Sequence, residues 1–237
     1  MRQFSPLFNP PPNAAAPRIC RRAGRRWLLA GLLIGGFLAS LFSPVQSRVQ
    51  AQTVSVPSIA DVRSAIADGR VPAAREMLLR LESESDTDFS VDFLRLARAP
   101  GGHFDAEEIN QLYLRAIRSL SHRPPSAGNV HQRLLVRATA AAHFTAVVDH
   151  RQAAKILVDA LEELGIADPS SSASRAKQLL KLAMRNAWSE LTSNRPKSAE
   201  DLYLKIIRLS QREGWAEIVS GETSNALLGL GWSTAMQ

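Results

Sequence analysis

Cysteine and metal-ligand patterns are nearly absent from this 237-residue chain. Its single cysteine, Cys20, lies upstream of an apolar segment, and cleavage beyond that segment would leave a mature protein without cysteine. Disulfides, thiolate nucleophiles and cysteine-ligated zinc are then excluded. The five histidines form no HExxH motif, and neither a Walker-type glycine loop nor a GxSxG motif occurs. We therefore expect no metal, no cofactor and no catalytic residue, and a protein that is not an enzyme.

Acidic residues are absent before Asp61, although seven arginines lie before Gln52. The formal net charge of +7 belongs to this leader, because 22 basic and 22 acidic residues follow it. A nucleic-acid-binding domain needs an excess of Lys and Arg to displace counterions from phosphates. The neutral composition of the body therefore argues against nucleic acid as a partner.

The N-terminal leader has the features of an export signal. Residues 1–26 combine five prolines with a cluster of arginines, which predicts a basic, disordered segment. Residues 27–42 then carry no charge, and Val49-Gln50-Ala51 supplies the small residues favoured before a cleavage site. Residues 27–51 are accordingly interpreted as a signal peptide cleaved after Ala51.

A single membrane anchor is the alternative, since a run of 16 apolar residues is only slightly shorter than the roughly 17 to 25 that span a bilayer. An uncleaved chain would contact the membrane through residues 27–42. The pair Arg25-Arg26 leaves both general and twin-arginine export open. Either reading places the body, residues 52–237, beyond the bacterial inner membrane, in the periplasm or anchored to that membrane.

A strand pattern is also missing from the body. From Ser58 onward the apolar residues repeat with a period near 3.6, and no alternating run is long enough for a strand. We therefore predict an all-α body of antiparallel helices joined by short turns. Helices are expected at residues 58–67, 72–84, 90–98, 105–121, 130–148, 151–164, 174–192, 198–212, 215–220 and 224–236.

Internal similarity indicates a repeated unit. Residues 111–120 and 201–210 share the pattern Leu-Tyr-Leu followed by Ile and Arg at the same spacing. Residues 136–169 resemble a tetratricopeptide repeat of 34 residues, with matching positions at Ala141, Phe144, Asp149, Ala153, Leu157, Ala160 and Pro169. Weaker matches give equivalent second-helix positions at Ala74, Ile109 and Ala199, spaced unevenly by 35 to 46 residues. A helical bundle without repeats would produce similar alternation.

The resemblance implies a right-handed superhelix of antiparallel helical hairpins, a TPR-like α-solenoid without a sheet. It also implies a scaffold that binds a protein or peptide on the face formed by the first helices. Polar positions inside first helices nominate Arg137, His143, Asn186 and Glu190 for this face. Trp215 and Trp232 are added because they lie at the less repetitive C-terminal end. Four other aromatic residues are assigned to packing: Tyr113, Phe144, Trp188 and Tyr203. The pair Glu162-Glu163 is interpreted as a solvated face.

The last segment, residues 224–237, resembles the first helix of a further repeat but is apolar nearly all round. Three explanations are open: the chain is a fragment of a longer protein, the helix packs against a partner or a second copy, or it is an imperfect cap. Two alternative functions follow from them. The chain would be the N-terminal interaction segment of a larger envelope enzyme, or a structural envelope component that self-associates through residues 224–237.

Overall fold

The computed structural model describes residues 56–237. The predicted leader and apolar segment, residues 1–51, lie outside this range. The described helices are α1 Ile59–Ala67, α2 Val71–Glu84, α3 Ser90–Ala97, α4 Ala106–Ser119, α5 Val130–Ala146, α6 His150–Leu164, α7 Pro169–Thr192, α8 Pro196–Ser210 and α9 Ser220–Ala235, with a short 3₁₀ helix, η1 Leu120–His122, after α4. No strand occurs within residues 56–237, which confirms the all-α prediction for this part of the chain.

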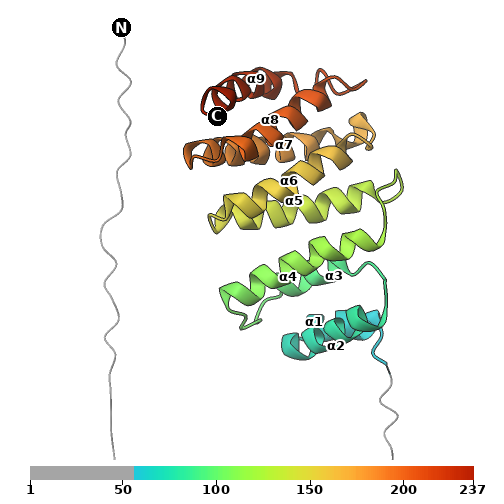
Figure 1. The fold of residues 1–237 in the computed structure, drawn as a ribbon. Helices are drawn as coiled ribbons and strands as arrows, with labels where there is room; N and C mark the ends of the chain where they lie inside the picture. The colour runs from blue at the N-terminus through green and yellow to red at the C-terminus, as the bar shows by residue number, and fades with distance from the viewer. Residues whose placement is uncertain (1–55) are drawn as a thin grey trace, which may run out of the picture. The chain divides into compact units, whose positions relative to one another are not determined.

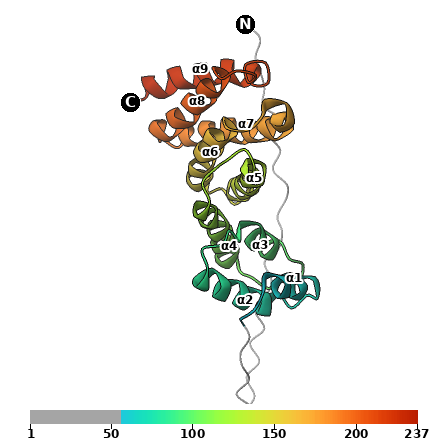
Figure 2. The same ribbon diagram turned by 90° about the vertical axis from the view of Figure 1, so that its right-hand side faces the viewer.

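The helices pack as successive hairpins. α1 contacts α2, and the pairs α3–α4, α5–α6 and α7–α8 are formed in the same way. Each first helix also contacts the first helix of the next hairpin, so that α1, α3, α5, α7 and α9 form a continuous row. Figures 1 and 2 show the hairpins following one another in chain order from α1 to α9. Each hairpin therefore packs against the hairpins that precede and follow it in the sequence, and we call each such contact a junction.

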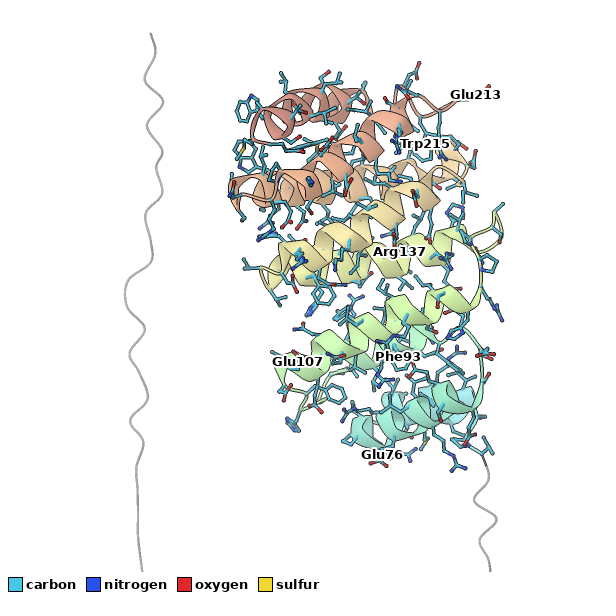
Figure 3. All side chains as sticks on the ribbon, viewed as in Figure 1. Glu76, Phe93, Glu107, Arg137, Glu213 and Trp215 are labelled. Atoms are coloured by element: carbon cyan, nitrogen blue, oxygen red, sulfur yellow. The ribbon has the colours of Figure 1, made fainter. Side chains whose placement is uncertain are left out.

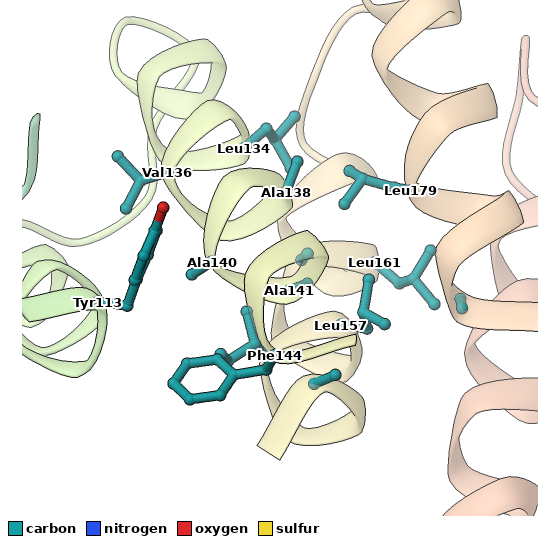
Figure 4. Close-up of a cluster of buried hydrophobic side chains, with 14 of the residues drawn as sticks. Tyr113, Leu134, Val136, Ala138, Ala140, Ala141, Phe144, Leu157, Leu161 and Leu179 are labelled. Carbon is teal, nitrogen blue, oxygen red and sulfur yellow. The ribbon is translucent and has the colours of Figure 1, made fainter. Parts of the chain in front are cut away.

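First helices are buried on two sides because they have two sets of neighbours. Figure 4 shows this for α5, where Val136 and Ala140 point toward Tyr113 of α4 and Leu134 points toward Leu179 of α7. All five of these side chains are buried. Helices in such positions have little free surface. A polar residue on a first helix can therefore be buried.

Second helices repeat one packing register. Small buried residues at the aligned position, Ala74, Ala153 and Ala199, allow the two helices of a hairpin to approach closely. Four residues later each second helix buries a large side chain, which is Leu78, Tyr113, Leu157 or Tyr203. The packing role predicted for both tyrosines is confirmed.

Three hairpins turn in the same way. Gly69, Val148 and Asn194 each follow a first helix with a positive φ, of 74°, 66° and 60°. In each case the next amide reaches back to a carbonyl five residues earlier, at 2.8 to 2.9 Å: Arg70 to Ala65, Asp149 to Phe144 and Arg195 to Glu190. These bonds satisfy carbonyls at the helix end. The aligned alanine follows five residues after each of the three turn residues.

Three predicted elements differ from the structure, and one of them is α9, which begins at Ser220 rather than at residue 224. α7 begins at Pro169 rather than near residue 174, because the Asp168 carboxylate caps the helix by accepting a hydrogen bond from the Ser171 amide at 2.9 Å. Hydrogen bonds from Ser170 and Ser171 lower the pKa of Asp168 to about 2. Residues 169–173, which lie outside the predicted helix, thus form the first turn of α7. Residues 215–219 form turns instead of a helix.

None of the helices between residues 56 and 237 combines the length and the apolar character needed to cross a bilayer.

Val148 provides a test of the turn. A left-handed conformation costs about 1–2 kcal/mol for a residue with a Cβ, and more strongly disfavours β-branched side chains. We expect Val148→Gly to raise the free energy of unfolding by about 1 kcal/mol, measured by urea denaturation. Val147→Gly is the matched control, since Val147 has a φ of −85° and is also exposed. It should lower stability, and equal effects of both variants would contradict the argument.

Candidate functional site

Arg137 lies in a buried ionic network inside the third hairpin rather than on a free face (Figure 3). Its guanidinium donates to Asp159 at 2.9 Å and to Glu163 at 3.0 Å, both on α6. Arg133 of α5 also donates to Glu163, at 3.1 Å through Nε. The prediction that Glu163 is solvated was wrong: this carboxylate is 5% exposed because two arginines compensate its charge. Arg137 therefore holds α5 and α6 together.

Asn186 is fully buried at the junction between the third and fourth hairpins. Its amide donates to Thr145 Oγ1 and to the Leu182 carbonyl, each at 2.8 Å, and its Oδ1 lies 2.9 Å from His150 Nδ1. One side chain on α7 is thus hydrogen-bonded to residues on α5, α6 and α7. A partner protein has no access to it in this conformation.

Glu190 is buried beside the turn from α7 to α8, where Arg195 donates two hydrogen bonds to it at 2.6 and 2.8 Å. Burial raises the pKa of Glu190, but hydrogen bonds from Arg195 and Ser198 outweigh it and hold the pKa below its usual value. The carboxylate is charged and paired at neutral pH. Its geometry supports the turn and leaves no lone pair facing solvent.

His143 packs between two hairpins. Its ring stacks on Tyr113 of α4 with centroids 4.1 Å apart, and Nε2 lies 2.7 Å from Asn110 Oδ1. Burial lowers the pKa of His143, so the neutral ring donates from Nε2 to the Asn110 oxygen. Among the four polar nominees, His143 alone is partly exposed, and the other three are buried.

The tryptophans are placed differently from the sequence prediction. Trp215, nominated for a binding surface, is 1% exposed in the connection between α8 and α9 (Figure 3), where it fills the core. Trp188, predicted to pack in the core, is 49% exposed. Trp232 is 58% exposed, as its nomination required, and its ring centroid lies 5.5 Å from that of Trp188. Sequence spacing did not indicate this pair, because the two residues are on different hairpins.

The two tryptophans border a groove between α7 and α9, which we name the tryptophan groove. It has a volume of about 330 Å³ and is lined by Met184, Trp188, Tyr203, Asn225, Leu228, Gly229 and Trp232. Only Asn225 and the tyrosine hydroxyl contribute polar side-chain groups to these walls apart from the indole nitrogens. Such a cavity fits one or two bulky apolar side chains.

Several large apolar side chains are exposed near the C-terminal end, and three of them, Trp188, Leu228 and Trp232, line this groove. Trp188, Leu227, Leu228, Trp232 and Met236 are each about half exposed or more, and all of them belong to α7 or to the segment that begins with α9. Large exposed apolar side chains beside a cavity mark interaction sites in soluble proteins. The geometry therefore favours the α7–α9 face over the buried polar nominees.

Gly229 determines how closely α9 approaches the groove floor. A Cβ at this position would overlap the Tyr203 ring of α8. Glycine thus allows α9 to lie directly on the ring, which is itself 1% exposed. Tyr203 and Gly229 together form the floor between the exposed tryptophans.

Metal-binding clusters and related proteins were the other possible indications of function. Among the residues that the structure describes, no group of three or more His, Cys, Asp or Glu side chains is arranged to hold a metal ion. Comparison with protein-family models, with curated proteins and with solved structures gives no match.

Gly229→Ala tests the floor of the groove. Alanine favours a helix by about 1 kcal/mol over glycine, but overlap with the Tyr203 ring should cost about 1–3 kcal/mol. We expect a net loss of stability in denaturant unfolding. Gly231→Ala is the matched control, because a Cβ there meets nothing and should stabilise α9. Stabilisation by both substitutions would show that α9 does not lie against Tyr203.

His143 should make folding depend on pH. Its pKa is lower in the folded state than in the unfolded chain, so the unfolded state binds more protons just below pH 6.5. The free energy of unfolding should therefore fall as the pH is lowered from 7.5 to 5.5, measured by urea denaturation. His143→Gln keeps an amide donor for Asn110 and should reduce this pH dependence. An unchanged slope would contradict the assignment.

Proposed function

We propose that this chain is a TPR-like helical-repeat scaffold that binds another protein by inserting apolar side chains of that protein into the tryptophan groove. The carrying observation is the half-exposed Trp188–Trp232 pair beside a preformed apolar cavity. Aromatic side chains at the centre of an interface supply much of its binding energy. The interaction is binding without catalysis.

The repeat assignment is supported by features that recur at equivalent positions. These are the continuous row of first helices, the left-handed residue in three turns and the buried alanine five residues later. Stacked hairpins of this kind form an extended surface, which suits contact with a protein or peptide.

We also propose that the protein is exported, because of the sequence of its leader. Positive charge before an apolar run and small residues at 49–51 support a periplasmic or inner-membrane-anchored scaffold. Self-association through residues 224–237 is the second candidate, favoured by the exposure of Leu227 and Met236 in this segment.

The groove is tested by replacing both aromatic walls. Full-length tagged protein is purified from its native cells as wild type, as Trp188→Ala/Trp232→Ala and as a control, Leu135→Ala/Ile166→Ala, which removes two other exposed apolar residues. Proteins that copurify are quantified by mass spectrometry. We expect the groove variant to lose a specific partner by about tenfold or more, and the control variant to retain it.

Equal recovery with the groove and control variants would contradict the proposal. Sedimentation velocity of the same three proteins separates the second candidate. A dimer of the wild-type chain that dissociates only in the groove variant would assign this face to self-association.

A further inference from the structure

A row of basic side chains leads along α7 to the tryptophan groove. Lys177, Lys181 and Arg185 are four residues apart, and all three are exposed. At about 100° per residue these three positions, Met184 and Trp188 fall within an arc of about 100°. The basic row and the apolar wall therefore share one face of the helix.

The row is not explained by the fold. None of its three members forms an ion pair with any residue between 56 and 237. Some arginines elsewhere in this range pair with carboxylates across a junction, such as Arg63 with Asp92 and Arg75 with Glu108. Like charges at i and i+4 destabilise a helix slightly. A row that costs stability and lacks internal partners is suited to an external anion.

The spacing of the row matches an extended acidic segment. Successive charges lie about 6 Å apart along the helix axis, since each residue rises about 1.5 Å. In an extended chain, side chains on one face recur about every 6.6 Å. Acidic residues at alternate positions would therefore meet Lys177, Lys181 and Arg185 in turn. The next residue on that face would reach Trp188.

Segments of the chain itself do not meet these requirements. The leader, residues 1–51, contains no acidic residue, so its charge would repel the row. The acidic segment 82–88 is followed by Phe89, which is 5% exposed and therefore has no free side chain for the groove. Glu82 and Glu84 in this segment are already paired with Arg115 and Arg80. Charge and accessibility both favour a different protein.

We propose that the occupant of the α7–α9 face is an extended acidic peptide segment of a partner protein, with carboxylates at alternate positions on the basic row and a bulky aromatic or aliphatic side chain in the tryptophan groove. This rests on the proposed function of the groove and specifies the chemistry of its partner. Carboxylates fix the position of the peptide, and the apolar side chain is removed from water.

The inference is tested with two fluorescein-labelled peptides of opposite direction, Glu-Ser-Glu-Ser-Glu-Ser-Phe and Phe-Ser-Glu-Ser-Glu-Ser-Glu. Binding to the full chain is followed by fluorescence anisotropy. We expect saturable binding of at least one peptide, weakened by salt because exposed charges are screened. Replacing the three Glu by Gln, or Phe by Ser, should each weaken it. Absence of binding by both peptides, or equal binding of the Gln peptide, would overturn the inference.

Charge reversal assigns the binding to the row. Lys177→Glu/Lys181→Glu/Arg185→Glu should weaken binding about tenfold or more. The matched control, Arg151→Glu/Lys155→Glu/Lys197→Glu, changes the net charge equally on residues that line a separate cavity beside the α7–α8 turn. It should retain affinity within about twofold if binding is local. Equal losses would mean that only the overall charge of the protein attracts the peptide, which would overturn the inference.

Lys181→Glu separates binding from folding. This single change places a carboxylate four residues from both Lys177 and Arg185, so the melting temperature should stay equal or rise while peptide affinity falls. Failure of this inference is distinct from failure of the proposed function. A partner lost by Trp188→Ala/Trp232→Ala, combined with no effect of charge reversal, would leave the groove as the site and remove its acidic ligand.

Discussion

Close approach of the two helices in three hairpins, α1–α2, α5–α6 and α7–α8, is the constraint on which this fold depends. It requires small side chains where the helices meet, supplied by Ala74, Ala153 and Ala199, and a turn that reverses the chain within a few residues. The left-handed residue at each of these turns brings the alanine to the same place on the second helix. Once the hairpins form, their first helices align into the continuous row that presents the α7–α9 face.

Junctions between hairpins combine apolar packing with specific polar bridges. Arg63 joins Asp92 between the first two hairpins, Asn110 meets His143 between the next two, and Asn186 meets His150 at the third junction. Buried polar groups cost free energy when unpaired, so each bridge favours one register of stacking over its neighbours. The buried polar residues of first helices thus fix the stacking of the hairpins.

Periodicity predicted the helices and the buried residues of the second helices, because the apolar residues of a second helix lie on one face. It failed for Asn186 and Glu190, since a first helix is covered from two sides and a polar residue can be buried among partners from distant segments. Trp188 could not be assigned from spacing either. Its exposure depends on Gly229 and Trp232, 41 and 44 residues later, and on the cavity they leave. Trp215 lies in a turn, where periodicity carries no information.

One wall of the tryptophan groove belongs to α9, which packs mainly against α7 and α8. A helix with so few neighbours opens at a lower free energy than the whole fold, and its amides exchange with solvent accordingly. Opening would remove Leu228 and Trp232 from the cavity together. Occupancy of the groove and docking of α9 are therefore thermodynamically linked, so a ligand that holds the indole rings also lengthens the ordered stack by one helix.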